Sequence, residues 1–242
     1  MKQIARAGLL GLTTLIAAPA WADNLTEADI KRLALEAILE NPQIVMDAVA
    51  ILQQREEEAA AAARAATLSN QRQLLERDPN APVIGNPDGD VTVVEFFDYN
   101  CPYCKRAAPE IEALIAADKN VRIVYREWPI LSEGSVFAAR AALAARNQGK
   151  YEEFHWALMD LEGRAEEASV LRVARGLGLD IDQLRVDMES QAVNDHIQTS
   201  MNLAKMLNFN GTPSFVIGEA TVPGFVPFDE LSRLVGEARP AE

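Results

Sequence analysis

Residues 91–109, with the sequence VTVVEFFDYNCPYCKRAAP, constrain the fold of this chain more than any other stretch. Their first half is a nearly continuous run of β-prone apolar residues, typical of a central strand that is covered on both faces. Cys101 and Cys104 follow, separated by Pro102 and Tyr103, where a helix is predicted to begin. Proline is tolerated in a first helical turn because its missing N–H would be unpaired there.

The predicted helix start favours a reactive thiol at Cys101. Unpaired backbone N–H groups and the positive end of the helix dipole stabilise a thiolate relative to a thiol. Cys104, one turn further along the helix, is placed to attack a mixed disulfide formed on Cys101. The stretch therefore predicts a redox-active cysteine pair.

A targeting signal is expected at residues 1–22. Lys2 and Arg6 precede an apolar run over residues 7–18, and Ala-Trp-Ala at 20–22 has the small-x-small pattern of a signal-peptidase site. The apolar run is too short to span a bilayer, and no other candidate follows it. We therefore expect an exported, soluble protein without membrane insertion.

Charge and cysteine content exclude several classes of function. The chain has 36 acidic and 23 basic residues, a formal net charge of −13, which disfavours nucleic acid or anionic lipid as a partner. A disulfide between Cys101 and Cys104 would close a ring too small to restrain the unfolded chain, so a structural role is disfavoured. A metal site would need more ligands, and His155 and His196 are distant in sequence and expected to be structural. Neither a metal nor an organic cofactor is expected.

Residues 23–77 are predicted to form a helical oligomerisation and linker segment. Thr26 begins a helix with a capping pattern, and Asn41-Pro42 separates it from a second helix. The two short helices have more apolar surface than they can cover alone, so another copy of the chain or the main domain should cover it. Residues 55–67 are rich in Ala and Glu and predict a solvated helical spacer; the alternative is a helix lying on the main domain through its alanines.

Residues 78–242 are predicted to form an α/β domain. Alternation at residues 121–125 indicates a second core strand that closes a βαβ unit with the first. A helical block follows at about 134–207, then a strand at 215–217 and a final helix at 229–238. This order predicts a thioredoxin fold with an inserted helical domain, preceded by the N-terminal helical extension.

Two motifs together resemble the DsbA family of exported thiol–disulfide oxidoreductases: FFDYNCPYC, and Gly-Thr-Pro-Ser-Phe at residues 211–215. The resemblance covers about residues 82–236. It implies that Cys101 is the nucleophile, that Cys104 is the resolving thiol, and that Thr212-Pro213 is a cis-proline turn beside them, where an extended substrate pairs as an added strand.

The family also implies where the protein acts and on what. The location would be the periplasm, and the partners would be unfolded or misoxidised exported proteins and a membrane thiol–disulfide redox partner. Pro102 and Tyr103 would meet the substrate beside Thr212. Tyr103 stands where the strongly oxidising type member has histidine, which leaves the redox potential open.

The leading segment, with its LENPQIVMDAV run, is similar to the extension of suppressor-of-copper-sensitivity C (ScsC) members of the family. That similarity implies a homo-oligomer, with a trimer favoured, and disulfide isomerase activity. Two other interpretations stay open: a monomeric DsbA-like dithiol oxidase, and an exported copper-handling protein that uses both thiolates as soft ligands.

Several polar residues near the cysteines have alternative interpretations. Glu95 lies within the apolar strand, either as a proton acceptor for Cys104, as often in the family, or at an edge that reaches solvent. Asp98 is expected to be a capping or solvated residue. Lys105 and Arg106 are expected to lie on an ordinary solvated helix face; the alternative is that their charges favour the Cys101 thiolate.

Overall fold

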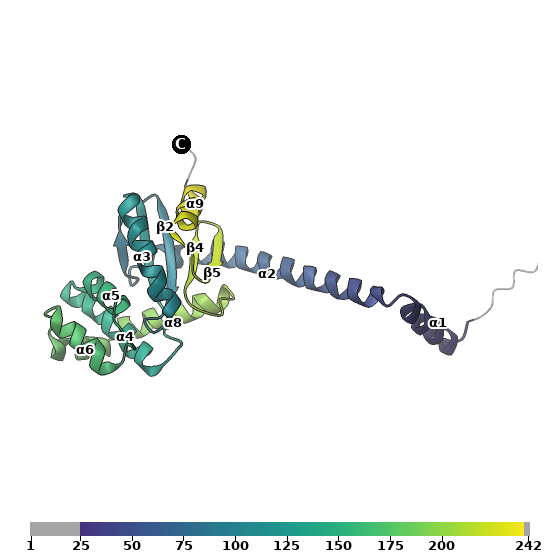
Figure 1. The fold of residues 1–242 in the computed structure, drawn as a ribbon, viewed down its shortest axis with the longest axis horizontal. Helices are drawn as coiled ribbons and strands as arrows, with labels where there is room; N and C mark the ends of the chain where they lie inside the picture. The colour runs from purple at the N-terminus through teal and green to yellow at the C-terminus, as the bar shows by residue number, and fades with distance from the viewer. Residues whose placement is uncertain (1–24, 240–242) are drawn as a thin grey trace, which may run out of the picture. The chain divides into compact units, whose positions relative to one another are not determined.

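The computed structural model describes residues 25–239 (Figure 1). The expected signal peptide, residues 1–22, lies outside the described residues. The chain divides into two compact units between Glu56 and Glu57. Within residues 25–239, no helix combines the length and apolar character needed to cross a membrane.

The first unit begins with helix α1, Glu27–Glu40, and its start is as predicted. The Asp29 backbone N–H donates to Thr26 Oγ1 over 3.2 Å, and the Thr26 N–H donates to Asp29 Oδ2 over 3.2 Å, which completes a capping box. Helix α2, Gln43–Arg77, follows the break at Asn41-Pro42.

Helix α2 corrects the prediction of a second short helix. It is continuous over 35 residues because its sequence contains neither proline nor glycine and is rich in strong helix formers. Asp78-Pro79 then ends it, as expected. Side chains between residues 55 and 67 are mostly exposed and burial begins at Leu68, which supports the spacer interpretation over a helix lying on its alanines.

The large apolar side chains of the first unit are exposed in the part of the chain that the structure describes. Each of them has between 40% and 70% of its surface exposed. They are Leu25, Ile30, Leu33, Leu35, Ile38, Leu39, Ile44, Val45, Met46, Val49, Ile51 and Leu52. Apolar side chains exposed in this number often mark a site of interaction.

The second unit is built on a five-stranded mixed sheet with the order β1-β3-β2-β4-β5. The central pair β2·β3 is parallel, as the predicted βαβ unit requires, and the other pairs are antiparallel. The strands are β1 Val83–Gly85, β2 Val91–Phe97, β3 Val121–Glu127, β4 Ser214–Ile217 and β5 Ala220–Pro223. The edge strand β1 was not predicted, because its three residues are too few to show a periodicity.

Helices cover both faces of the sheet (Figure 1). Helices α3, Pro102–Ala117, and α9, Phe228–Ala238, lie over one face. On the other face, Leu68 and Leu75 from the end of α2 join a core cluster with residues of β2, β3 and β4. The sheet is therefore buried on both sides, as the continuous apolar run of β2 predicts.

Buried arginines of β3 hold the C-terminal end of α2. Arg126 is fully buried, and its Nη1 donates to Asp78 Oδ2 over 2.8 Å while its Nη2 donates to the Leu74 and Leu75 carbonyls. Arg122 donates to the Glu76 carbonyl. These cations face unpaired carbonyls at the negative end of the helix dipole. The last turns of α2 therefore belong to the second unit.

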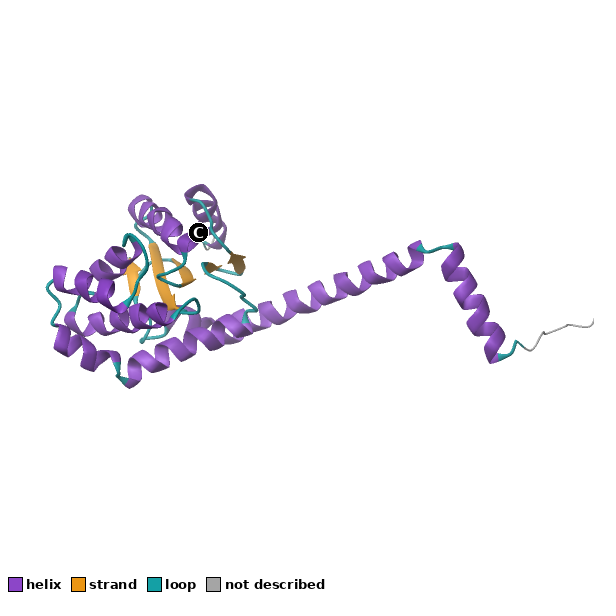
Figure 2. Cartoon of the chain, turned by 60° about the horizontal axis from the view of Figure 1, so that its bottom comes forward, coloured by secondary structure: helices purple, strands orange, loops and turns teal. Residues whose placement is uncertain are grey.

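The helical insertion lies between β3 and β4 and runs from Glu133 to Met206, close to the predicted 134–207 (Figure 2). Its helices are α4 Glu133–Ala145, α5 Tyr151–Met159, α6 Glu167–Gly176, α7 Ile181–Met188 and α8 Gln191–Met206, with a 3₁₀ turn η1 at Arg146–Gln148. Its core is continuous with that of the sheet face under α3.

Candidate thiol–disulfide site

The two cysteines lie where the sequence places them. Cys101 is the N-cap residue of α3, with extended backbone (φ −80°, ψ 119°), and Pro102 occupies the first helical turn. Cys104 lies one turn into the helix. Cys101 keeps 5% of its surface exposed and Cys104 none, so only the first sulfur is open to a partner.

The surroundings of Cys101 favour its thiolate. A hydrogen bond from the Cys104 thiol, followed by contributions from Thr212 and from the backbone N–H groups of Cys104 and Tyr103, lowers the pKa of Cys101 to about 6 against the opposing effect of burial. Both N–H groups belong to the unpaired set at the helix start. Cys101 is therefore largely ionised at neutral pH.

Cys104 is shifted in the opposite direction. Burial raises the pKa of its thiol well above the usual range, and its bond to Cys101 and the nearby charge of Glu95 act in the same sense. The pKa of one thiol of the pair is thus lowered, and the pKa of the other is raised.

Glu95 lies on the central strand β2 and is 2% exposed. The edge interpretation is wrong because β2 pairs on both sides, with Glu95 opposite Tyr125 on β3 and Phe215 on β4. Burial, and then the charge of Cys101, raises the pKa of Glu95 to about 8. Its Oε1 has no hydrogen-bond partner among the described residues. A carboxyl in this state can exchange a proton near neutral pH.

The Thr212-Pro213 segment lies directly beside Cys101, although 111 residues separate the two in sequence. The peptide bond between Thr212 and Pro213 is cis, as the resemblance implies. Cys101 Sγ lies 3.1 Å from the Thr212 carbonyl oxygen, to which it donates a hydrogen bond when it is protonated. Strand β4 begins at Ser214 and pairs antiparallel with β2, and this pairing brings the segment to the cysteines.

The residues around the pair differ in exposure. Pro102 and Tyr103 are exposed, Tyr103 by 57%. The solvated-face expectation is wrong for Lys105, whose Nζ donates to the Leu161 carbonyl of the insertion. Arg106 is exposed, but its guanidinium stacks 4.3 Å above the Phe225 ring centroid. The surface next to the cysteines is therefore apolar and aromatic as well as charged.

Asp98 differs from its expected solvated state. It is 1% exposed, and its carboxylate accepts the backbone N–H groups of Asn100 (2.8 Å), Ile130 (2.9 Å) and Leu131 (3.0 Å). The expected capping role is closer to what the structure shows, because the carboxylate accepts hydrogen bonds from backbone N–H groups. Asn100 was not singled out from the sequence, although its place directly before Cys101 was a signal.

Both histidines are buried in helices of the insertion, as expected of structural residues. Burial lowers the pKa of His155 to about 3, and its Nδ1 lies 3.1 Å from the Tyr99 hydroxyl. His196 Nε2 lies 2.8 Å from Glu127 Oε2. In the part of the chain that the structure describes, no group of three or more His, Cys, Asp or Glu side chains is arranged to hold a metal ion.

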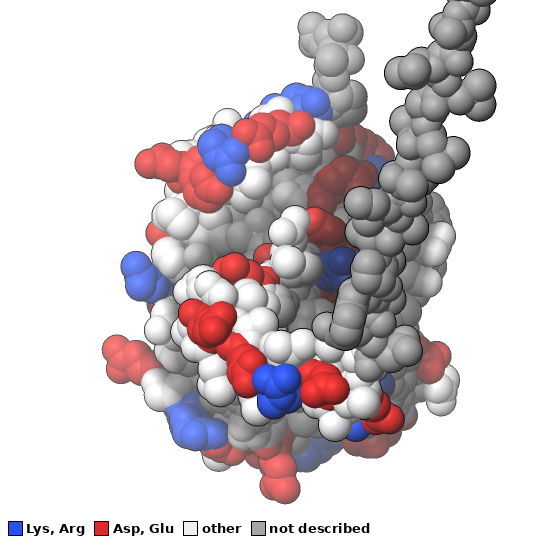
Figure 3. All heavy atoms as spheres, turned by 90° about the vertical axis from the view of Figure 1, so that its right-hand side faces the viewer, with Lys and Arg blue, Asp and Glu red and all other residues white. Residues whose placement is uncertain are grey.

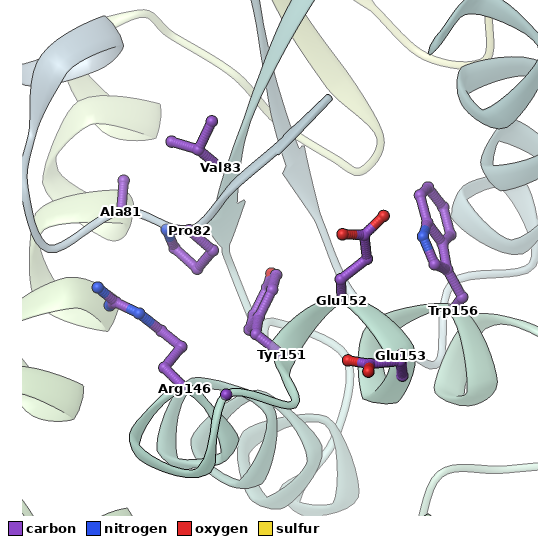
Figure 4. Close-up of a pocket in the computed structure, with 9 residues that line it drawn as sticks. Ala81, Pro82, Val83, Arg146, Tyr151, Glu152, Glu153 and Trp156 are labelled. Atoms are coloured by element: carbon purple, nitrogen blue, oxygen red, sulfur yellow. The ribbon is translucent and has the colours of Figure 1, made fainter. Parts of the chain in front are cut away.

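A cavity of about 660 Å³ lies elsewhere, between the chain that enters β1 and helix α5 (Figure 4). Arg146, Tyr151, Glu152 and Trp156 are among its lining residues, and none of the predicted site residues is. Acidic side chains are spread over the face shown in Figure 3, with Lys and Arg between them. Neither feature competes with the cysteine pair as the centre of the chemistry.

Comparison with known proteins agrees with this geometry. The family model of the DSBA-like thioredoxin domain matches residues 92–236, and that of the copper resistance protein ScsC N-terminal domain matches residues 27–59. The chain spans only about a quarter of the length of the curated relatives it matches. One is Na(+)/H(+) antiporter NhaA 3 of Salinispora tropica, 32% identical over 66% of this chain and 25% of that protein.

Several solved structures are also similar to this chain. A thioredoxin-like oxidoreductase from Silicibacter pomeroyi is 65% identical, with a TM-score of 0.70, over 71% of this chain and 99% of that one. A periplasmic thioredoxin-like protein from Salmonella enterica serovar Typhimurium is 30% identical, with a TM-score of 0.65, over 70% and 96%. A linker-deletion mutant of Proteus mirabilis ScsC is 27% identical, with a TM-score of 0.66, over 91% and 98%.

These matches cover both the cysteine-bearing domain and the helices before it. The chain belongs to the DSBA-like thioredoxin family of thiol–disulfide oxidoreductases and has an N-terminal extension of the ScsC type.

Proposed function

We propose that the protein is a periplasmic thiol–disulfide oxidoreductase that acts on protein disulfides, and that it is a disulfide isomerase when oligomeric. The observation that carries the proposal is the contrast between the two cysteines. Cys101 lies at a helix N-terminus, is 5% exposed and has a lowered pKa, whereas Cys104 is completely buried and has a raised pKa. Cys101 would be the nucleophile and Cys104 the resolving thiol.

In the isomerase direction, the Cys101 thiolate attacks one sulfur of a substrate disulfide. A mixed disulfide forms and the other substrate sulfur leaves as a thiolate. A different substrate thiolate then displaces Cys101, so no electrons are transferred overall. Cys101 leaves readily because its pKa is low.

If no second substrate thiol arrives, Cys104 resolves the complex. Its sulfur attacks Cys101 and gives up its proton, the substrate leaves with two electrons, and the pair is left as a disulfide. Glu95, with a pKa of about 8, is our candidate acceptor for that proton. A membrane thiol–disulfide partner would return the pair to its reduced state.

The substrate would bind beside the pair in extended form. The Thr212 carbonyl, 3.1 Å from Cys101 Sγ, is placed to pair with its backbone, and the exposed Pro102 and Tyr103 would contact its side chains. We propose unfolded or misoxidised exported proteins as this substrate. Such proteins present extended segments and exposed apolar side chains.

Residues 23–77 would form the oligomerisation and linker segment of a redox domain over residues 78–242, with the last turns of α2 packed on that domain. The exposed apolar side chains of residues 25–52 fit a second and third copy of the same chain, and the ScsC resemblance favours a trimer. Several Cys101 sites in one assembly suit an isomerase, because a scrambled substrate must be attacked repeatedly.

Two alternatives are outcomes of the same test. A monomeric DsbA-like oxidase would transfer its disulfide to dithiols and would not need the extension. A copper-handling protein would bind Cu(I) between the two thiolates and catalyse no exchange.

The test is the refolding of a scrambled-disulfide protein in parallel with the oxidation of a dithiol peptide. The chain without residues 1–22 is compared with residues 57–242. We expect the longer chain to restore the scrambled substrate and the shorter one to lose most of that activity while it still oxidises the peptide. Equal activities of the two chains in both assays would favour the oxidase. No exchange by either chain would overturn the proposed function.

A further inference from the structure

We propose that Asn100 is a positioning residue through which the helical insertion fixes Cys101 at the N-terminus of α3. The consequence for exchange rests on the proposed function, but the placement of the thiol does not. Asn100 is joined to Cys101 by one peptide bond, and all of its side-chain hydrogen bonds go to residues beyond β3.

Both the nitrogen and the oxygen of the Asn100 side-chain amide have hydrogen-bond partners. Its Nδ2 lies within donor distance of Ser132 Oγ (3.2 Å), Ser135 Oγ (3.1 Å) and the Ala165 carbonyl (3.0 Å), and its Oδ1 accepts the Ala165 N–H over 2.7 Å. An amide supplies two hydrogens and an oxygen with two lone pairs, so partners are present for both hydrogens and for one lone pair.

The residues that bind the Asn100 side chain occupy capping or buried positions. Ser132 is the N-cap of α4 and accepts the Ser135 N–H over 3.1 Å. Ala165 is fully buried in the segment before α6, and Ser135 is 1% exposed. One side chain therefore ties the residue before the thiol to the starts of two helices.

The other two residues of the turn, Asp98 and Tyr99, bind the same part of the chain as Asn100. The Cys101 N–H donates to the Asp98 carbonyl over 3.0 Å, which closes a turn over residues 98–101. The Asp98 carboxylate binds the backbone of residues 130–131, and the Tyr99 hydroxyl lies against His155 of α5. The three side chains before Cys101 thus anchor on the insertion or on the segment leading to it.

This anchoring determines the distances that stabilise the thiolate. Cys101 Sγ must stay within hydrogen-bond reach of the Cys104 thiol and of the N–H groups of Tyr103 and Cys104. Hydrogen bonds weaken steeply as their geometry departs from the optimum. If Asn100 is lost, the turn can shift, and the thiolate loses part of its stabilisation.

The test is the titration of the Cys101 thiolate by its ultraviolet absorbance in the reduced, full-length Asn100→Ala variant. We expect the pKa of Cys101 to rise by about one unit, which lowers the thiolate fraction at pH 6 by about fivefold. The alkylation rate of Cys101 at that pH should fall by the same factor.

Asn194→Ala is the matched control. Asn194 lies in α8 of the same insertion and also uses both ends of its amide, with Oδ1 accepting from Arg140 and Nδ2 donating to the Ser190 carbonyl. It should lose comparable stability and leave the titration unchanged. Equal titrations for wild type, Asn100→Ala and Asn194→Ala would overturn the proposal, and so would equal shifts in both variants.

Ser135→Ala keeps the proposal testable if Asn100→Ala does not fold. It removes one acceptor of Asn100 and should shift the titration in the same direction by a smaller amount; no shift would count against the proposal. In the Asn100→Ala background it should add nothing. The titration needs no substrate, so a wild-type protein without exchange activity would contradict the proposed function and leave this inference standing.

Discussion

The two units of the chain differ in how far their large apolar side chains are exposed. In residues 25–52 the large aliphatic side chains are 40% to 70% exposed, whereas Leu68 and Leu75, on the same helix α2, are 3% and 1% exposed. Helix propensity does not differ enough to explain this, because one continuous helix contains both kinds of position. The end of α2 packs on the sheet, whereas nothing among residues 25–239 covers the apolar side chains of residues 25–52.

This comparison separates chemistry from assembly. The second unit contains both cysteines and its own core, so we expect the proposed exchange chemistry to need nothing from the first unit. The first unit contains no cysteine and has no buried residue in α1. Each change below should affect one unit and leave the other unaltered.

The largest effect should come from Cys101→Ser. A serine hydroxyl is not ionised at neutral pH, so exchange should slow by more than about a thousandfold, or about 4 kcal/mol in the barrier. The matched variant Cys104→Ser keeps the nucleophile and should accumulate a mixed disulfide with substrate, visible on a non-reducing gel. Residual exchange in Cys101→Ser above that level would show that another group is the nucleophile. Neither variant should change the molar mass of the assembly.

Leu75→Ala and Leu52→Ala compare the two ends of α2 directly. Leu75 is 1% exposed and Leu52 57%, so the first change should lower the unfolding free energy of the second unit by about 3 kcal/mol and the second by less than about 0.5 kcal/mol. Trp128 and Trp156 both lie in the second unit, and the remaining Trp21 is in the expected signal peptide, so tryptophan fluorescence during urea unfolding reports this unit. Equal losses would mean that Leu52 packs on the domain and not on another copy.

Glu95→Gln should make the second unit more stable at alkaline pH. The pKa of Glu95 is raised from 4.5 to about 8, so its contribution to stability is present below pH 4.5 and is lost as pH rises through 8. The advantage of the glutamine variant should grow by on the order of 3 kcal/mol between pH 5 and pH 8. Denaturant unfolding at the two pH values measures it. A constant difference would indicate a carboxyl of ordinary pKa.

The smallest effect should come from Thr26→Ala. The change removes the N-cap side chain of α1 and should weaken that helix by about 1 kcal/mol. Far-ultraviolet circular dichroism should show earlier loss of helix on heating, while the tryptophan-reported transition keeps its midpoint. A shift of that midpoint would mean that the two units unfold together.

Much of the fold is encoded in local patterns. The apolar run of β2, the alternation in β3, the helical spacing of the insertion and the capping pattern at Thr26 each predicted an element that the structure contains. The pairing of Cys101 with Thr212 came from a resemblance between motifs, since no local pattern reports a contact across 111 residues.

The errors have a common cause. Asp98 was expected to be a capping or solvated residue, and Lys105 was expected on a solvated face. Instead Asp98 binds the backbone N–H groups of residues 130–131 and Lys105 binds the carbonyl of residue 161, all distant in sequence. Asn100 was overlooked for the same reason: its side-chain hydrogen bonds go to three residues distant in sequence, Ser132, Ser135 and Ala165. The edge interpretation of Glu95 depended on strand order, which a single strand does not encode.

The proposed function depends most on one claim: the exposed apolar side chains of residues 25–52 form the surface through which copies of the chain assemble. Light scattering measures this directly, as the molar mass in solution of the chain without residues 1–22 and of residues 57–242. We predict about three times the chain mass for the longer protein and a single chain mass for the shorter one. A single chain mass for both would contradict the account and leave the cysteine pair as the site of a monomeric oxidase.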